Sequence, residues 1–488
     1  MTTVGKMASM TQRLVHLDLK GAAPKLSYLE EIIPLIQQWG ATGLIIEYED
    51  MFPYHGDISE VASSQAYSVE EVRKLLNMAE RYNLEVMPLV QTFGHLEFAL
   101  KHETFAKIRE IPHYPTTLCP CHPDSVTMVT TMLDQVLEMH PKTKWFHIGC
   151  DEVYHLGKCD LCRRKMADEN LTAQQLFFGH VKAVATYIKT HYPTITPIVW
   201  DDMFRFAQVK DLKTSGLGGL VEPMIWHYLS SFLLPENLFD NLSTVFPDIW
   251  VASAFKGATG VCASMTNISF HVENHLSWLR LIDEKGSKFN SVRGFAITGW
   301  QRYDHFAVMC ELLPVAIPSL AMCLSVAKQR VFTQDMHMHI SNQLEFKPGL
   351  PLNPYQCHVP TECRYPGSAV YAAMVDWIQI QAKCEQFLQS DTLCSWMNDY
   401  NIERGFVNPM HIEPIVTEAT NILARLCEVQ IKVQKSMEPI FADDTVTEWI
   451  QTYLEPKSKR FSDIVEKGQK VLGRVNFKSY EEKMSQDT

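Results

Sequence analysis

Apolar and polar positions follow two alternating patterns from residue 13 to about residue 330. Short apolar runs, typical of buried strands, are separated by longer segments with helical spacing. The apolar runs are 14–19, 42–48, 84–90, 144–149, 196–200, 223–228, 248–253 and 294–300. Most of these eight runs are continuously apolar, as expected for parallel strands that are covered on both faces.

Three of the intervening segments begin with the spacing of a capping box, in which a Ser or Thr is followed three residues later by Glu or Gln. The pairs are Ser27–Glu30, Ser68–Glu71 and Thr172–Gln175. Gly40 is placed to end the first of these helices. Eight strand–helix units in one run predict an α/β fold, a (β/α)₈ TIM barrel. The competing doubly wound sheet usually has a Gly-rich phosphate turn after its first strand, whereas KGAAPK at 20–25 has one Gly and a Pro.

The pattern changes after residue 335. Residues 336–366 are Pro-rich, and long helical patterns follow at 368–389, 413–436 and 444–472. We therefore expect three parts: a barrel over 1–335, a Pro-rich connection over 336–366 and a helical C-terminal region over 367–488. Such a helical region packs on the barrel or on a second subunit, so a homodimer is a candidate assembly.

Composition narrows the class of protein. The 488 residues include 46% hydrophobic and 20% charged residues, and the net charge of −12 argues against a nucleic acid or an anionic membrane as the main partner. Residues 1–10 lack a continuous apolar stretch, so we expect no secretory signal. The 13 cysteines are then expected to be reduced, in the cytoplasm or nucleus.

Polar and aromatic residues gather where the predicted strands end, which is where barrel enzymes build their sites. They are His16, Asp18, Lys20, Glu47, Glu49, Asp50, Gln91, His95, Asp151, Glu152, Trp200, Asp201, Asp202, Trp226, His227, Tyr228, Trp300, Arg302 and Asp304. Each feature alone has an ordinary explanation, such as a solvated loop or a core tryptophan. Together, carboxylates and tryptophans at strand ends indicate a carbohydrate site, because sugar rings stack on flat aromatic side chains.

A metal site is the main competing interpretation of the strand ends and cysteines. Cys159 and Cys162 have good zinc spacing, but Cys119 and Cys121 enclose a single Pro, which is poor spacing. Metal-dependent barrel amidohydrolases usually carry H-x-H on the first strand, whereas the chain has H-x-D at 16–18. We therefore expect no metal and no cofactor, and keep the amidohydrolase as an alternative.

The stretches HIGCDE at 147–152 and QTFGH at 91–95 resemble two motifs of the family 20 glycoside hydrolases, the β-N-acetylhexosaminidases. His147, Gly149, Asp151 and Glu152 match the H-x-G-x-(D/E)-E signature of that family. QTFGH is similar to its D-x-P-G-H motif and keeps the Gly and His. The resemblance extends over residues 13 to about 330.

The resemblance implies a retaining exo-enzyme that removes a terminal β-linked GlcNAc or GalNAc from a glycan or glycoconjugate with the help of the substrate's own acetamido group. Glu152 would be the general acid and base, and Asp151 would orient the acetamido group. Tyr228 would hydrogen-bond the acetamido carbonyl, and His95 would support the acid or bind substrate. The sugar pocket would be lined by Trp200, Trp226 and Trp300. We also expect the charge of Asp151 to raise the pKa of Glu152.

Two departures from the family pattern concern substrate binding. An Arg that commonly follows the first strand's Asp is absent after Asp18, and the family's Asp of the D-x-P-G-H motif is Gln91 here. The candidates to replace the Arg contact are Glu49, Asp50, Arg302 and Asp304. The missing Arg also keeps open the alternative of a sugar-binding protein that has lost catalysis.

Overall fold

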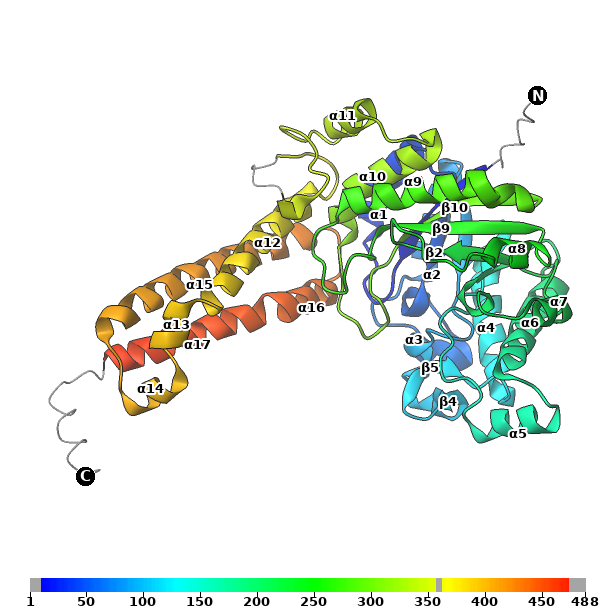
Figure 1. The fold of residues 1–488 in the computed structure, drawn as a ribbon, viewed down its shortest axis with the longest axis horizontal. Coiled ribbons are helices and arrows are strands. Elements are labelled where there is room, and N and C mark those ends of the chain that lie inside the picture. Colours follow the sequence, from blue (N-terminus) through cyan, green and yellow to red (C-terminus); the bar gives the residue numbers. More distant parts are fainter. Residues whose placement is uncertain (1–9, 357–361, 474–488) are drawn as a thin grey trace. The chain divides into compact units, whose positions relative to one another are not determined.

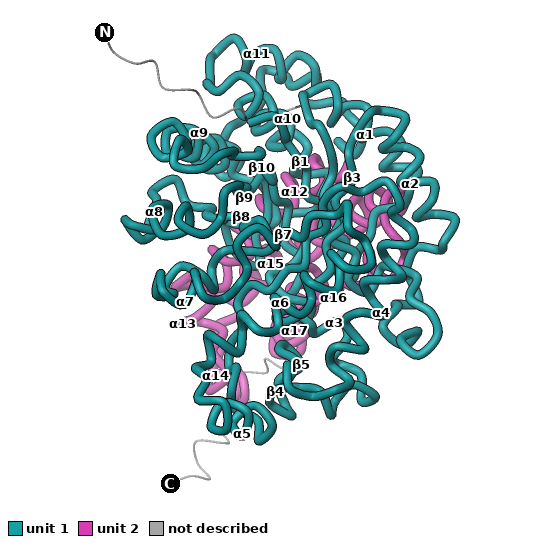
Figure 2. Tube along the Cα trace, turned by 90° about the vertical axis from the view of Figure 1, so that its right-hand side faces the viewer, with its two compact units in different colours: residues 1–368 teal, residues 369–488 magenta. Residues whose placement is uncertain are grey.

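The computed structural model describes residues 10–356 and 362–473. The chain divides into two compact units, residues 1–368 and residues 369–488, which are coloured separately in Figure 2. Within the described residues, none of the helices combines the length and apolar character needed to cross a bilayer.

The first unit contains a closed barrel of eight parallel strands in the order β1-β10-β9-β8-β7-β6-β3-β2. In Figure 1, β2, β9 and β10 are labelled, with α9 and α10 beside them. These strands are β1 (Gln12–Asp18), β2 (Gly43–Glu47), β3 (Glu85–Leu89), β6 (Trp145–His147), β7 (Thr196–Trp200), β8 (Glu222–Trp226), β9 (Asp248–Lys256) and β10 (Ser291–Gly299). Each overlaps one of the apolar runs, so the predicted barrel is confirmed.

Helices follow most of the strands around the barrel. They are α1 (Leu26–Trp39), α2 (Val69–Arg81), α3 (Glu97–Leu100), α4 (Pro123–Met139), α5 (Asp160–Asp168), α6 (Ala173–His191), α7 (Val209–Thr214), α8 (Leu238–Ser243), α9 (Ile268–Lys285), α10 (Leu313–Gln329) and α11 (Gln334–Gln343). Short 3₁₀ helices lie at Glu49–Met51, Gly56–Val61, Glu103–Ile108, Asp202–Phe204, Gly286–Lys288 and Pro354–Gln356. A two-stranded antiparallel hairpin, β4 (Arg109–Ile111) with β5 (Tyr114–Leu118), was not predicted.

Two of the three predicted capping boxes are present. Ser68 and Thr172 each accept a hydrogen bond at the start of α2 and α6. The prediction for Ser27 is wrong, because the carbonyl of Lys25 already accepts from Tyr28 and α1 begins at Leu26. Ser27 therefore lies inside the first turn, and the cap residue Lys25 makes no side-chain cap. Gly40 ends α1 with φ of 109°.

The barrel interior is filled by side chains, so it is a packed core and not a channel. Its buried members are Leu14, Ile45, Met87, Leu89, Ile198, Trp200, Met224, Trp250, Ala252 and Ala296. Trp226 and Trp300 pack against this core while remaining partly exposed. The core thus supports the ends of β8 and β10, from which the polar loops emerge.

The second unit is helical, as predicted. It contains α12 (Ser368–Leu388), whose first residue belongs to the first unit, and α13 (Asp391–Trp396), α14 (Asp399–Arg404), α15 (Pro409–Met437), α16 (Asp443–Tyr453) and α17 (Glu455–Leu472). The helix predicted over 444–472 is wrong as a single element, because it breaks at Leu454 and restarts with Pro456 in its first turn. The short helices α13 and α14 were not predicted.

Candidate active site

The catalytic candidates follow β6 in a turn with unusual backbone angles. Asp151 and Glu152 come four and five residues after His147, the last residue of the strand. Cys150 has φ of 68° and Glu152 has φ of 46°, and His95, in the loop after β3, has φ of 49°. Non-glycine residues rarely adopt positive φ, and such strain concentrates at functional sites.

Two glycines of the motifs allow the loops after β3 and β6 to interlock. Gly149 has φ of 66°, and a Cβ there would lie 1.9 Å from Oε1 of Gln91. A Cβ on Gly94 would lie 2.4 Å from the carbonyl oxygen of Asp151. Both clashes are too close for any side chain, so the two motifs share one packing requirement.

His95 lies between the two carboxylates. Its Nε2 is 3.1 Å from Oε2 of Glu152 and 3.7 Å from Oδ2 of Asp151. Gln91 donates from Nε2 to Oδ1 of Asp151 at 2.9 Å and accepts from the backbone N–H of Cys150 at 3.2 Å. Gln91, which replaces the family's Asp, therefore holds Asp151 directly.

The charges of the three groups are coupled. Burial alone would lower the pKa of His95, but the Asp151 carboxylate and the hydrogen bond with Glu152 outweigh it and raise this pKa to about 10. Burial raises the pKa of Asp151, whereas the hydrogen bond from His95 lowers the pKa of Glu152. The expectation of a raised pKa for Glu152 is therefore wrong for the site without substrate. The imidazolium of His95 lies close to Glu152 and stabilises its charged form.

Asp202 and Tyr154 also support the pair. Asp202 was noted at a strand end without a role, and Tyr154 was not predicted. Oδ2 of Asp202 accepts from the backbone N–H of Glu152 at 2.9 Å, and its Oδ1 accepts from Nε1 of Trp226 at 3.3 Å. Burial, followed by the nearby Asp151, raises the pKa of Asp202 to about 7. The Tyr154 hydroxyl hydrogen-bonds the Glu152 side chain. Asp202 stood at a strand end in the sequence, but Tyr154 had no such signal.

A cavity of about 360 Å³ opens at this end of the barrel. Its lining comprises Lys20, Glu47, Gln91, His95, Asp151, Glu152, Trp200, Trp226, His227, Tyr228, Leu229, Gly257, Ala258, Trp300, Arg302 and Tyr303. Trp226 stacks on Tyr228 with ring centroids 5.3 Å apart, and Trp200 lies 6.1 Å from Trp300. The cavity thus combines an aromatic wall with the carboxylate pair, and its volume suits a small ligand.

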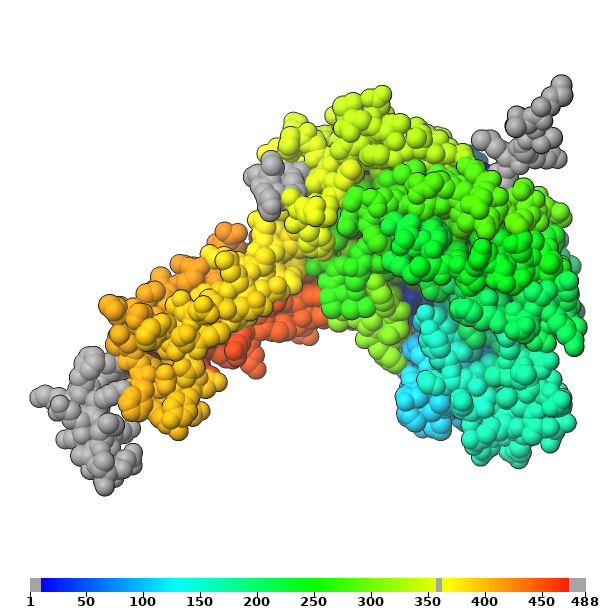
Figure 3. All heavy atoms as spheres, viewed as in Figure 1, coloured from blue at the N-terminus to red at the C-terminus, as the bar shows by residue number. Residues whose placement is uncertain are grey.

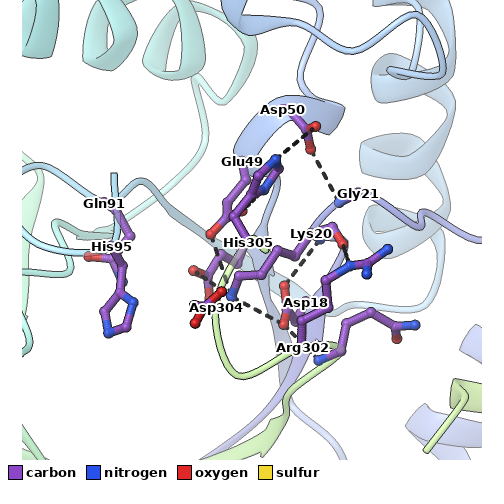
Figure 4. A network of polar contacts seen from close by, with 12 residues as sticks. Asp18, Lys20, Gly21, Glu49, Asp50, Gln91, His95, Arg302, Asp304 and His305 are labelled. Atoms are coloured by element: carbon purple, nitrogen blue, oxygen red, sulfur yellow. Dashed lines mark hydrogen bonds and ion pairs between the residues drawn. The ribbon is translucent and has the colours of Figure 1, made fainter. Parts of the chain in front are cut away.

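Lys20 lines the cavity. It belongs to a buried network of charges, shown in Figure 4. Its Nζ lies 3.4 Å from Asp18, 3.5 Å from Glu49 and 3.7 Å from Glu47, and its side chain is 4% exposed. Burial would lower the pKa of Lys20, but these carboxylates raise it well above its ordinary value. Lys20 therefore places a permanent cation beside the ring of Trp300, at 5.3 Å from its centroid.

The other candidates for the missing Arg contact are arranged around Lys20. Glu49 accepts from Nδ1 of His305 at 2.9 Å, and Asp50 accepts from the backbone N–H of Gly21 at 3.2 Å. Neither of these carboxylates lines the cavity, nor does Asp304, which instead accepts from the backbone N–H groups of residues 306 and 307. Arg302 does line the cavity, and its Nε donates to the carbonyl of Lys20 at 3.1 Å.

Metal-ligating side chains gather elsewhere in the first unit. Among the described residues, Glu110, Cys119, Cys159 and Cys162 form a group of potential ligands outside the cavity lining. His16 and Asp18 are not arranged as two ligands of one metal ion. His16 pairs with Glu47 at 3.0 Å, and Asp18 pairs with Lys20.

Comparisons with known proteins identify the family of this chain. Residues 31–227 match the model of the glycosyl hydrolase family 20 catalytic domain. Human hexosaminidase D is 38% identical over 459 residues, with 93% of each chain covered. Bovine hexosaminidase D is 47% identical over 338 residues, which cover 68% of this chain and 96% of the relative. The crystal structure of a β-N-acetylhexosaminidase from Bacteroides fragilis has a similar fold, with a TM-score of 0.52 at 16% identity, over 69% of this chain and 70% of that one. The chain therefore belongs to the β-N-acetylhexosaminidases of glycosyl hydrolase family 20.

Proposed function

We propose that the chain is a retaining exo-β-N-acetylhexosaminidase that removes terminal, non-reducing β-linked GalNAc or GlcNAc from glycans or glycoconjugates by substrate-assisted hydrolysis. The observation that supports this proposal best is the Asp151–Glu152 pair, joined by His95 at the wall of an aromatic cavity. We also propose that the enzyme works in the cytoplasm or nucleus, which cell fractionation would test.

In the first step Glu152 protonates the glycosidic oxygen, and the carbonyl oxygen of the substrate's acetamido group attacks C1. The aglycone leaves and an oxazolinium ring forms. Asp151 accepts a hydrogen bond from the acetamido N–H and offsets the positive charge of this ring. Gln91 supports that role, because its amide fixes Oδ1 of Asp151 at 2.9 Å.

In the second step Glu152, now a carboxylate, removes a proton from water as the water attacks C1. The ring opens, the acetamido group is restored and the configuration at C1 is retained. Trp226 and Trp300 line the cavity and are partly exposed, so they can offer flat faces to the sugar ring, whereas Trp200 is 1% exposed and packs mainly in the barrel core. Tyr228 also lines the cavity and is our candidate to donate to the acetamido carbonyl.

Lys20 is our candidate to bind the sugar hydroxyls in place of the missing Arg. It lines the cavity, it is charged, and Arg302 beside it also lines the cavity. An ammonium group donates in several directions, whereas a guanidinium donates in a planar fork. We therefore expect this chain to discriminate less between GlcNAc and GalNAc, which differ only at the 4-hydroxyl, than an enzyme with the Arg contact.

Hydrolysis of 4-nitrophenyl β-GlcNAc and β-GalNAc tests the roles of the pair. We expect Glu152→Gln and Asp151→Asn each to lower kcat by about 10²–10⁴-fold, the usual contribution of a positioned acid–base group. Glu70→Gln and Asp57→Asn, which change exposed carboxylates outside the cavity, are matched controls. Wild-type turnover in both site variants would contradict the assignment.

Acetamido participation is tested with substrates that carry one, two or three fluorine atoms on the acetyl group. Fluorine makes the carbonyl oxygen a poorer nucleophile, so kcat/KM should fall steadily along this series. A kcat/KM that does not change along this series would exclude the acetamido group of the substrate as the nucleophile. Binding of N-acetylhexosamines without hydrolysis of any substrate would instead favour the inactive sugar-binding protein.

A further inference from the structure

Three cysteines and a buried carboxylate converge outside the catalytic cavity. Sγ of Cys119 lies 3.3 Å from Sγ of Cys159 and 3.5 Å from Sγ of Cys162. Oε2 of Glu110 lies 3.1 Å from Sγ of Cys162. The four ligand atoms all lie within 4.8 Å of one another. All three cysteines are free thiols, so no disulfide accounts for their meeting.

The spacing suits a tetrahedral zinc ion. Sulfur ligands ~2.3 Å from zinc in a tetrahedron lie about 3.8 Å apart, a few tenths of an ångström more than the observed Sγ–Sγ distances. Cys159 and Cys162 have the C-x₂-C spacing of a zinc half-site, and the backbone N–H of Cys162 donates to Sγ of Cys159 at 3.3 Å. Three thiolates favour zinc over hard cations such as Mg²⁺ or Ca²⁺.

The surroundings of Glu110 favour a cation as well. The residue is 1% exposed, and one oxygen accepts from the backbone N–H groups of Lys158 and Cys159. Among the residues that the structure describes, no Lys or Arg forms an ion pair with Glu110. Its second oxygen faces the thiols, where a bound cation would offset the cost of burying the carboxylate.

We propose that Glu110, Cys119, Cys159 and Cys162 bind one structural zinc ion. Sequence spacing alone disfavoured this site because it offered Cys121 as the partner of Cys119, whereas the β4–β5 hairpin brings Glu110 to that position. Each thiol loses its proton on binding, so zinc with three thiolates and one carboxylate leaves a site of net charge −2. All four positions are filled, as in structural and not catalytic zinc sites.

The zinc ion would join two loops that shape the active site. Glu110 lies in β4 and Cys119 directly follows β5, so both belong to the segment between β3 and α4. Cys159 caps α5 and Cys162 lies in its first turn, in the segment that follows Glu152. The hairpin and α5 lie side by side at one end of the first unit (Figure 3). The hydroxyl of Thr117 already donates to the carbonyl of Tyr154 across this junction at 3.1 Å.

Metal analysis of the full-length protein, purified without a polyhistidine tag, is the first test. We expect about one zinc per chain, as for a single four-ligand site. Replacing zinc with cobalt(II) should give the intense d–d bands of a tetrahedral site and a sulfur-to-cobalt charge-transfer band. Wild-type protein that contains no zinc and takes up neither metal would overturn the proposal. A Cys119–Cys159 disulfide found by non-reducing peptide mapping would do the same.

Variants identify the ligands. We expect Cys119→Ser, Cys159→Ser, Cys162→Ser and Glu110→Gln to lose most of the zinc. The exposed Cys262→Ser is a control that should keep it. Cys121→Ser should keep it too, because the Cys121 side chain contacts Cys162 but lies outside the group of four ligand atoms. Zinc loss in Cys121→Ser with retention in Glu110→Gln would overturn the ligand set. The cobalt spectrum of the wild type decides the question even if a variant fails to fold.

Removing zinc also has a local consequence that a distant adventitious ion would not have. Chelation should speed amide hydrogen exchange in residues 109–119 and 153–162, with little change in α9, on another part of the barrel. Unchanged exchange at both segments after complete zinc removal would contradict a structural role.

Discussion

His95 influences the protonation of both carboxylates that we propose as catalytic. Its imidazolium lies 3.1 Å from Glu152 and 3.7 Å from Asp151, and its pKa is raised to about 10. A general acid must be protonated, whereas the group that stabilises the oxazolinium must be charged. The cation favours the charged form of both groups, which suits the role proposed for Asp151 and opposes the role proposed for Glu152.

Replacing His95 with Asn should move the pH profile of kcat/KM upward. Without the cation the pKa of Glu152 and that of Asp151 both rise, so both limbs of the profile shift to higher pH, and kcat falls. The exposed His55→Asn variant should leave the profile unchanged. An unshifted profile in His95→Asn would show that His95 does not control these pKa values.

The same variant tests stability. The pKa of His95 rises from an ordinary 6.5 to about 10 on folding, so its contribution is complete below pH 6.5 and is lost as pH rises toward 10. Thermal unfolding of the wild type should therefore lose stability across this window relative to His95→Asn. Parallel curves for the two proteins would contradict the raised pKa.

Gly149→Ala should reduce both stability and activity. The cost of φ near 66° adds to the clash with Gln91, so we expect a loss of about 2–4 kcal/mol in the free energy of unfolding. Gly56→Ala is a matched control, because Gly56 has φ of 65° but nothing lies within 4 Å of its added Cβ. Equal losses in the two variants, measured by urea unfolding, would mean that the contact with Gln91 is not the cause.

At the scale of elements, local signals were reliable where the side chain itself caps the helix. Ser68 and Thr172 cap α2 and α6 as predicted, whereas the start of α1 is set by backbone bonds to Lys25. The break at Leu454 did have a local signal, because Pro456 favours the first turn of a new helix. The hairpin β4–β5 depends on pairing between two segments, for which the apolar pattern gives no signal.

Helix packing in the second unit depends on a close approach of α15 and α17. A Cβ on Gly468 would lie 2.2 Å from Cγ2 of Val416, so Gly468→Ala should lower the free energy of unfolding by about 1–3 kcal/mol. Gly179 in α6 has open space around it, so Gly179→Ala should be stabilising by about 0.5–1 kcal/mol through helix propensity. Urea unfolding of both variants checks that the free energy of unfolding falls in Gly468→Ala and rises in Gly179→Ala. A stabilised Gly468→Ala would contradict the close packing of α15 on α17.

At the scale of the whole molecule, the barrel and the Asp151–Glu152 pair could be predicted because strand periodicity and the motif are local in sequence. Among the partners of the pair, His95 was expected from the resemblance, whereas Tyr154 was not. Whether Glu49 or Lys20 faces the cavity depends on His305, which binds Glu49 from 256 positions away. The assignment of a homodimer stays a prediction, which sedimentation of the full chain would test.

All the residues that line the cavity belong to the first unit. We therefore expect a thiazoline that mimics the oxazolinium intermediate to slow hydrogen exchange in the loops after β1, β3, β6, β8 and β10. Exchange in α15 and α17 should stay unchanged at the same ligand concentration. Slowed exchange confined to the second unit would contradict this location of the site.

The close approach of Gly94 to the carbonyl of Asp151 has a consequence for engineering. Because the loop after β3 lies directly against the loop that holds the carboxylates, neither can be exchanged alone for that of another barrel. A donor loop with any side chain at position 94 would displace the backbone of Asp151 and, with it, the carboxylate pair. Libraries that aim at new glycan specificity should therefore transplant both loops as one cassette, or vary only the walls formed by β8 and β10.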